Sequence, residues 1–150
     1  MKETKIISGF PAIGKSSLFK NNNDYSILDS DSIDFSWVDK TDKRNPDFPN
    51  NYIKHIKENI GKVDYILIST HHLVRKELEN NKMDYTIVYP SIELKEEYME
   101  RIKKRGNTEA FAKIINDNWE KFIKEIESET FPKLIKLNKG QYLSDVISKI

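Results

Sequence analysis

The sequence predicts an α/β fold in which helices cover both faces of a parallel sheet. Short apolar runs rich in β-branched residues alternate with segments whose apolar residues recur at helical spacing. Several of the runs are apolar at consecutive positions, as expected for strands that are covered on both faces. This alternation implies a parallel sheet with right-handed crossovers. Since ligands of such sheets bind beyond the carboxyl ends of the strands, functional residues are expected there.

Five strands and six helical segments are expected. The strands are residues 4–8, 25–29, 65–70, 85–89 and 133–137. The helical segments are residues 15–20, 50–60, 71–80, 92–105, 108–127 and 141–150. Their inward-facing residues include Ile53, Ile56 and Ile60; Val74 and Leu78; Leu94, Tyr98 and Ile102; Phe111, Ile115, Trp119, Phe122 and Ile126; and Leu143, Val146, Ile147 and Ile150. Thr108 is the predicted N-cap of the fifth helix.

Composition limits the class of protein. A chain of 150 residues fits one domain, 1–150, with one core. Its formal net charge of +1 signals no broad surface for nonspecific nucleic-acid binding. The lack of cysteine excludes disulfides and thiolate metal sites. Because no apolar run reaches membrane-spanning length and no signal-peptide core is seen, we expect a soluble, cytoplasmic protein without a membrane partner.

A glycine-rich segment follows the first strand and fits the pattern Gly-x-x-x-x-Gly-Lys-Ser. Its glycines allow a tight wrap, so that backbone N–H groups and the start of the next helix converge on a phosphate. Lys15 would reach the β- and γ-phosphates, and the Ser16 hydroxyl would ligate Mg²⁺. The predicted nucleotide-binding residues are Gly9, Phe10, Pro11, Ala12, Ile13, Gly14, Lys15, Ser16 and Ser17.

Two aspartates follow the second strand. Alternation along an extended chain would point Asp29 and Asp31 to the same side, beyond the carboxyl end of that strand. Asp29 is the predicted metal residue beside Ser16, and Asp31 is the predicted base that accepts the proton of an attacking hydroxyl. The third strand lacks a terminal aspartate, which argues against a motor ATPase or a GTPase.

Arginine is rare, so each one is a candidate phosphate ligand. Arg101 and Arg105 share a helix face just before Gly106 and could stabilise charge on a transferring phosphoryl group; both are predicted catalytic residues. The alternative is a solvated basic helix end.

Acceptor contacts are expected after the second and third strands. Residues 30–51 are rich in proline and Asx residues, which predicts an irregular binding loop, where Phe35, Trp37 and Phe48 could stack a base. The predicted acceptor-binding residues are Asp31, Trp37, Arg44, Thr70, His71 and Arg75, with His72 as a further contact.

With the cradle 9–16, the Asp29-x-Asp31 pair and the Arg101/Arg105 pair, the chain resembles the small P-loop kinases, such as shikimate, gluconate and adenylate kinase, and is most similar to phage-type nucleoside or nucleotide kinases. The resemblance implies a three-layer P-loop NTPase fold with strand order 2-3-1-4-5, a short lid around residues 101–110, and adenine near 138–140. The segment after Asp31 does not match the acceptor signatures of shikimate or gluconate kinase.

Three functions are therefore open. The first is an ATP- and Mg²⁺-dependent kinase that phosphorylates a nucleoside, a nucleotide or a similar small acceptor. The second is a kinase that acts on a polynucleotide end or on a modified base in DNA, against which the near-zero charge argues mildly. The third is a non-enzymatic nucleotide-binding module, which would have little use for Asp31 beside the cradle.

Overall fold

The computed structural model describes residues 3–21, 24–30 and 46–150. Its centre is a five-stranded sheet in the order β2-β3-β1-β4-β5, in which all neighbouring strands are parallel. The strands are β1 (Lys5–Gly9), β2 (Ile27–Asp29), β3 (Tyr65–Ile68), β4 (Thr86–Pro90) and β5 (Lys133–Leu137). The predicted α/β class, the parallel sheet and the strand order are confirmed.

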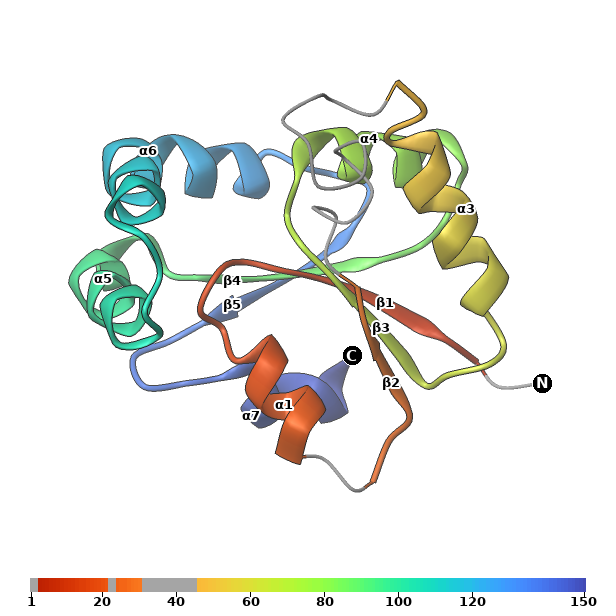
Figure 1. The fold of residues 1–150 in the computed structure, drawn as a ribbon, viewed down its shortest axis with the longest axis horizontal. Helices are drawn as coiled ribbons and strands as arrows, with labels where there is room; N and C mark the ends of the chain where they lie inside the picture. Colours follow the sequence, from red (N-terminus) through yellow and green to blue (C-terminus); the bar gives the residue numbers. More distant parts are fainter. Residues whose placement is uncertain (1–2, 22–23, 31–45) are drawn as a thin grey trace.

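Helices lie on both faces of the sheet. They are α1 (Lys15–Asn21), α3 (Asn50–Asn59), α4 (His72–Asn80), α5 (Lys95–Lys104), α6 (Glu109–Glu127) and α7 (Leu143–Val146), with 3₁₀ turns η1 (Ile92–Leu94) and η2 (Ile147–Lys149). Figure 1 shows α1 and α7 on one side of the sheet, and α3, α4 and α6 on the other. None of the helices in the described ranges is long and apolar enough to cross a membrane.

The three central strands are buried, as their consecutive apolar residues predict. β1 pairs with β3 through Ile7 and Leu67, and with β4 through Ser8 and Ile87. Every residue of β3 and β4 is buried. The edge strands β2 and β5 are only partly covered, which agrees with their more polar sequences.

Tertiary contacts explain where the elements differ from the predicted ranges. Residues 92–105 form η1 and then α5 rather than one helix, because the indole N–H of Trp119 donates to the Ile92 carbonyl oxygen at 2.7 Å. The prediction that Ile60 faces the core was wrong: α3 ends at Asn59, and Ile60 is 42% exposed. Thr108 is confirmed as the N-cap of α6, where its hydroxyl accepts from the Phe111 N–H at 3.1 Å.

The core reaches the loop that follows β1. Helix α6 buries Ile115, Trp119 and Ile126 as predicted. The ring of Phe10, the first residue after β1, packs edge-on against Trp119 with ring centroids 5.5 Å apart, and against Tyr98 at 6.3 Å. Because Phe10 is only 1% exposed, the start of this loop is fixed by the core rather than by its own backbone alone.

Candidate functional site

The glycine loop, residues 9–14, connects β1 to α1 at the carboxyl end of the sheet. Ala12 and Gly14 have left-handed backbones, with φ of 68° and 99°. Gly9 is constrained by packing instead: a Cβ added there would lie 2.7 Å from both Ile13 Cδ1 and Lys15 Cδ, so these side chains would have to shift. The Phe10 N–H also donates to the Val88 carbonyl oxygen at 3.0 Å, which ties the loop to β4. Sequence and packing therefore favour one tight course for this loop.

Lys15 folds back across the loop. Its Nζ donates to the Gly9 carbonyl oxygen at 2.6 Å, so the ammonium group lies at the mouth of the wrap. Ser16 and Ser17 follow at the exposed start of α1. The structure thus places a cation and two hydroxyl-bearing residues beside one another at the end of β1, as the sequence predicted.

A cavity of about 500 Å³ lies against the loop and α1. We call it the basic cavity. Its lining residues are Ala12, Gly14, Lys15, Ser16, Ser17, Lys20, Arg101, Lys104, Arg105 and Tyr142. Half of these are lysine or arginine, and none of those described is acidic. The cavity therefore suits a polyanion.

Arg101, a predicted catalytic residue that the resemblance places in a short lid, is held inside the structure. Its side chain is 10% exposed. Nη1 donates to the Ala12 carbonyl oxygen at 3.1 Å, and Nη2 donates to the Gln141 carbonyl oxygen and to Glu97 Oε2, both at 2.9 Å. The guanidinium also lies over the rings of Tyr98 and Tyr142, at 4.4 and 3.9 Å from their centroids. Arg101 therefore ties the glycine loop to the turn before α7.

That turn is attached to the loop by further bonds. The Leu143 N–H donates to the Ile13 carbonyl oxygen at 2.8 Å, and the Gly140 N–H donates to both oxygens of Glu97 at 3.2 Å. Tyr142 is 43% exposed and packs on Gly14, where an added Cβ would come within 3.1 Å of its Cδ1. Sequence reasoning selected residues 138–140 but missed Glu97 and Tyr142. The spacing of Glu97 and Arg101, four apart on α5, was the available signal.

Arg105 lies one turn beyond Arg101, at the C-cap of α5. It is exposed and lines the basic cavity. Its side chain forms no ion pair with the described residues. Of the two predicted arginines, Arg105 is therefore the one whose guanidinium can turn toward a ligand.

Asp29 ends β2 and is exposed, in register with Leu67 of β3. Because β3 lies between β2 and β1, two strand spacings, roughly 10 Å, separate Asp29 from the start of the glycine loop. The next residue, Ser30, is fixed by His55 Nε2 at 3.0 Å from its hydroxyl and by Tyr52, whose hydroxyl donates to its carbonyl oxygen at 2.7 Å. The predicted site residues Asp31, Trp37 and Arg44, together with Phe35, lie outside the described residues.

No three histidine, aspartate or glutamate side chains in the described ranges group as a metal site. A divalent cation held through Ser16 and Asp29 would therefore take its remaining ligands from the phosphates and from water, which is how Mg²⁺ is commonly bound with nucleotides.

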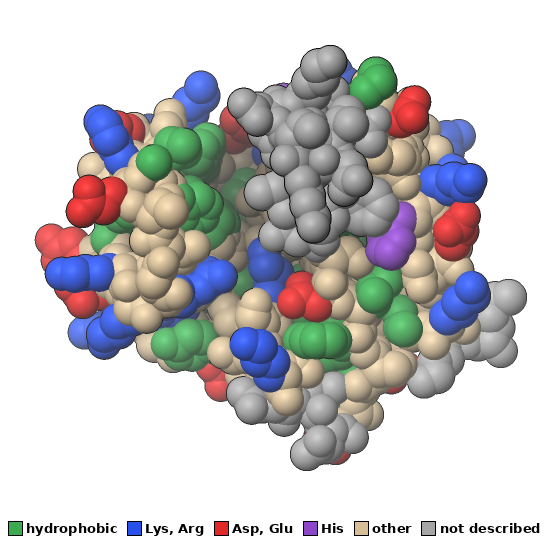
Figure 2. Space-filling view, in the orientation of Figure 1, with side chains coloured by type: hydrophobic (Ala, Val, Ile, Leu, Met, Phe, Trp, Pro, Cys, Tyr) green, Lys and Arg blue, Asp and Glu red, His purple; other side chains and the backbone are tan. Residues whose placement is uncertain are grey.

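A second cavity, of about 700 Å³, lies on the other side of the loop. We call it the apolar cavity. Figure 2 shows hydrophobic side chains gathered on the α6 side of a hollow in the visible face. The described lining residues are Phe10, Pro11, Ser69, Thr70, His71, His72, Leu73, Arg75, Phe111, Ile114, Ile115, Lys121, Phe122, Glu125 and Ile126. The structure thus brings the predicted acceptor residues Thr70, His71 and Arg75 to a cavity that also touches the glycine loop.

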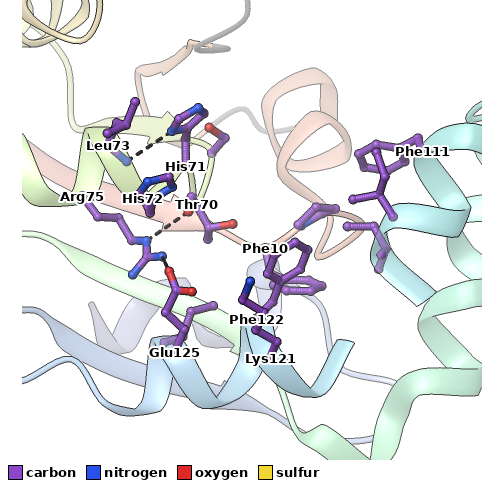
Figure 3. Close-up of a pocket in the computed structure, with 15 residues that line it drawn as sticks. Phe10, Thr70, His71, His72, Leu73, Arg75, Phe111, Lys121, Phe122 and Glu125 are labelled. Atoms are coloured by element: carbon purple, nitrogen blue, oxygen red, sulfur yellow. Dashed lines mark hydrogen bonds and ion pairs between the residues drawn. The ribbon is translucent and has the colours of Figure 1, made fainter. Parts of the chain in front are cut away.

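Arg75 is 4% exposed at one end of this cavity. Its Nε donates to the Thr70 carbonyl oxygen at 3.0 Å. Nη1 and Nη2 donate to Glu129 Oε1 at 2.8 Å and Glu125 Oε1 at 2.9 Å. Figure 3 shows the guanidinium reaching from α4 toward Glu125, with Phe111 at the opposite end of the cavity. Sequence reasoning selected Arg75 but missed both glutamates, which lie fifty or more residues away.

His71 caps α4. Its Nδ1 accepts from the Leu73 N–H at 3.2 Å, and its ring stacks on that of His72 with centroids 5.5 Å apart. Phe48, predicted to stack a base, packs edge-on against His71 at 5.3 Å and is stacked with Tyr52 at 6.4 Å. These rings extend the aromatic surface beside the carboxyl end of β3.

Comparisons with known proteins place the chain in no family. No family model matches the sequence, and no curated protein matches it. What the chain does must therefore be inferred from two cavities that touch different parts of residues 9–17: the apolar cavity touches Phe10 and Pro11, and the basic cavity touches Ala12 and residues 14–17.

Proposed function

We propose that the protein is an ATP-dependent phosphotransferase of the small P-loop kinase type. The observation that carries the proposal is the glycine loop with Lys15 at its mouth, opening on a cavity whose charged lining in the described ranges is entirely basic. Such a loop supplies converging backbone N–H groups and a lysine to a triphosphate.

The donor triphosphate would lie in the basic cavity. On binding, Lys15 exchanges the Gly9 carbonyl oxygen for the β- and γ-phosphates, so its present hydrogen bond keeps the side chain near its working place. Arg105 and Lys104 line the same cavity and would offset charge on the transferring group. Tyr142 has an exposed ring next to Gly14, which would offer a stacking surface to the base.

The residues present fit Mg²⁺ bound together with the triphosphate. The Ser16 hydroxyl and the Asp29 carboxylate are the groups that would hold it, directly or through water. Mg²⁺ would neutralise charge on the phosphates when bound. The cavity itself lacks a carboxylate among its described residues, so the protein's own positive charge faces the donor.

The acceptor would lie in the apolar cavity, across the loop from the donor. Its hydroxyl oxygen would form a bond to the γ-phosphorus, and the bond from that phosphorus to the β–γ bridging oxygen would break, releasing ADP. The hydroxyl proton would pass to a carboxylate, for which Asp31 remains the candidate on sequence grounds. The second cavity at Phe10 and Pro11 supports an enzyme over a non-enzymatic module, since a module needs only the donor site.

The test is an ADP-release screen of the full chain with ATP-Mg²⁺ across nucleosides, nucleotides, sugars and DNA. We expect release that depends on one acceptor class and falls about a thousandfold or more in Lys15→Ala, because the lysine contacts the transferring group. Lys54→Ala, an exposed lysine of α3, is the matched control and should retain full turnover. Undiminished turnover in Lys15→Ala would contradict the proposal, as would nucleotide binding without transfer to any acceptor.

A further inference from the structure

The apolar cavity combines an aromatic wall with a charged end that is already neutralised. From this we infer that the phosphoryl acceptor is an uncharged heteroaromatic alcohol of nucleoside size rather than a nucleoside monophosphate. The inference deepens the proposed function and rests on it, because it assigns the acceptor side of the same reaction.

The size and lining of the cavity fit a ring compound. About 700 Å³ lies within the range typical of small-molecule sites. Phe10 is fixed by the core, and Phe111 and Phe122 lie three helical turns apart on the same face of α6. Figure 3 shows Phe10 and Phe122 near the middle of the cavity and Phe111 at one end. These rings and the neighbouring isoleucines favour a flat, weakly polar occupant.

The buried arginine at the other end is not available to a phosphate. Its guanidinium donates to two carboxylates and one carbonyl oxygen, so its single positive charge faces two negative ones. Glu125 itself lines the cavity. A phosphate dianion placed at this end would be repelled by both carboxylates. If it took their place on the arginine, the two carboxylates would lie near one another without a cation between them, which is unfavourable.

One further cation, Lys121, lines the cavity from α6. It is exposed, and a single exposed ammonium is strongly hydrated, so it is a weak ligand for a phosphate compared with a bidentate arginine. The described lining therefore suits a neutral acceptor, because it supplies an aromatic surface and the hydroxyl groups of Ser69 and Thr70 next to the glycine loop. It does not suit a charged acceptor, because the buried cation in this lining, Arg75, is already paired with carboxylates.

Calorimetric titration of the full chain tests this directly. The protein is loaded with Mg²⁺ and the β,γ-imido analogue of ATP, then titrated with nucleosides and with the corresponding monophosphates. We expect at least one nucleoside to bind about tenfold or more tightly than its monophosphate, since the added dianion enters a cavity lined by Glu125 whose buried arginine is already paired with two carboxylates. Monophosphates that bind as tightly, or no binding by any nucleoside, would overturn the inference. Binding of single-stranded DNA alone would do the same and would favour a polynucleotide acceptor.

A charge-removing variant provides the sharper comparison. In Glu125→Gln the arginine keeps Glu129 but loses one opposing charge, so the monophosphate should gain several-fold in affinity while the nucleoside changes little. Because Glu125 is 42% exposed, this single change should not prevent folding. Glu120→Gln removes an equivalent exposed charge elsewhere on α6 and should shift neither ligand. A Glu125→Gln protein with an unchanged ratio of the two affinities would count against the inference.

The two proposals fail differently. If the ATP analogue does not bind, the proposed function fails, and the same nucleoside titration on the unloaded protein still decides the acceptor class. If nucleosides bind in the expected order but no phosphate is transferred, the acceptor class stands and the kinase assignment fails.

Discussion

The two cavities that meet at residues 9–17 differ in how the protein treats charge. In the basic cavity five of the described lining residues, Lys104 and Arg105 among them, are lysine or arginine and none is acidic, so positive charge accumulates along the wall. In the apolar cavity the buried arginine is matched by two glutamates, and aromatic rings fill the wall. A single short loop thus separates a surface that attracts anions from one that does not.

The two buried arginines show the same contrast. Arg101 donates to carbonyl oxygens of the glycine loop and of the turn before α7, and its carboxylate partner among the described residues is Glu97. Arg75 donates to two carboxylates and joins α4 to α6. The single carboxylate of Glu97 balances the charge of Arg101 one for one, whereas the two carboxylate partners of Arg75 exceed its charge. The partners of an arginine, rather than its presence, decide what a cavity can bind.

After the loss of Lys15, the largest expected effect comes from adding a methyl group at Gly14, which lines the basic cavity. Gly14→Ala places a Cβ 3.1 Å from Tyr142 at a left-handed φ of 99°. We expect ATP affinity, measured by calorimetry, to fall about a hundredfold, since both the loop backbone and the adjacent ring must move. Gly106→Ala is the control: its φ of 78° imposes similar strain, but its added Cβ meets nothing within 4 Å. Equal losses in both variants would show that contact with Tyr142 is irrelevant.

Exchanging each buried arginine for lysine should affect stability in both cases but ATP binding in only one. Lysine cannot reproduce the forked donors of either guanidinium, so both variants should lose about 2 kcal/mol of unfolding free energy in urea. Arg101→Lys should also weaken ATP binding about tenfold, because the Ala12 and Gln141 carbonyl oxygens lose their common donor. Arg75→Lys should leave ATP affinity unchanged. The opposite pattern would mean that the loop is positioned from the α4 side.

A smaller effect should appear in alkaline solution. Burial raises the pKa of Tyr98, whose ring lies under Arg101, to about 12, although the arginine charge opposes the rise. The unfolded chain ionises near pH 10, so it releases the proton first and the folded state loses stability as pH rises from about 10 to 12. Tyr98→Phe should remove this component, so its unfolding free energy should fall less than that of the natural chain, by roughly 1 kcal/mol at pH about 11. Tyr89 and Tyr85 have raised pKa values as well, so the informative quantity is the difference between the two proteins. Parallel curves would show that Tyr98 does not titrate in this range.

The sequence was sufficient to predict the sheet, but it did not reveal which groups the buried arginines contact. The alternating strand and helix patterns predicted the parallel sheet, because these patterns are local in the sequence. The family resemblance, which starts from the recognisable glycine loop, predicted the order of the strands. The glycine loop and Lys15 were predictable since they are contiguous. The boundary at η1 was not, because it depends on the Trp119 indole, 27 residues away.

The acceptor side shows the same limit more clearly. Arg75 was chosen because arginine is rare, and nothing local to it reveals Glu125 or Glu129. The resemblance placed Arg101 in a short lid, yet the carbonyl oxygen of Ala12, 89 residues away, accepts a hydrogen bond from its side chain. Periodicity reports which face of a helix is buried, but it carries no information on which distant polar group meets a buried side chain.

The most direct test of the contrast is the salt dependence of binding to each cavity in one protein. The natural chain would be titrated with ATP-Mg²⁺, and separately with the nucleoside that binds best, at about 50 and about 300 mM KCl. Because salt screens the lysines and arginines of the basic cavity, ATP affinity should fall about fivefold or more while nucleoside affinity should change by less than about twofold. Equal salt dependence for the two ligands, or a stronger one for the nucleoside, would contradict this account.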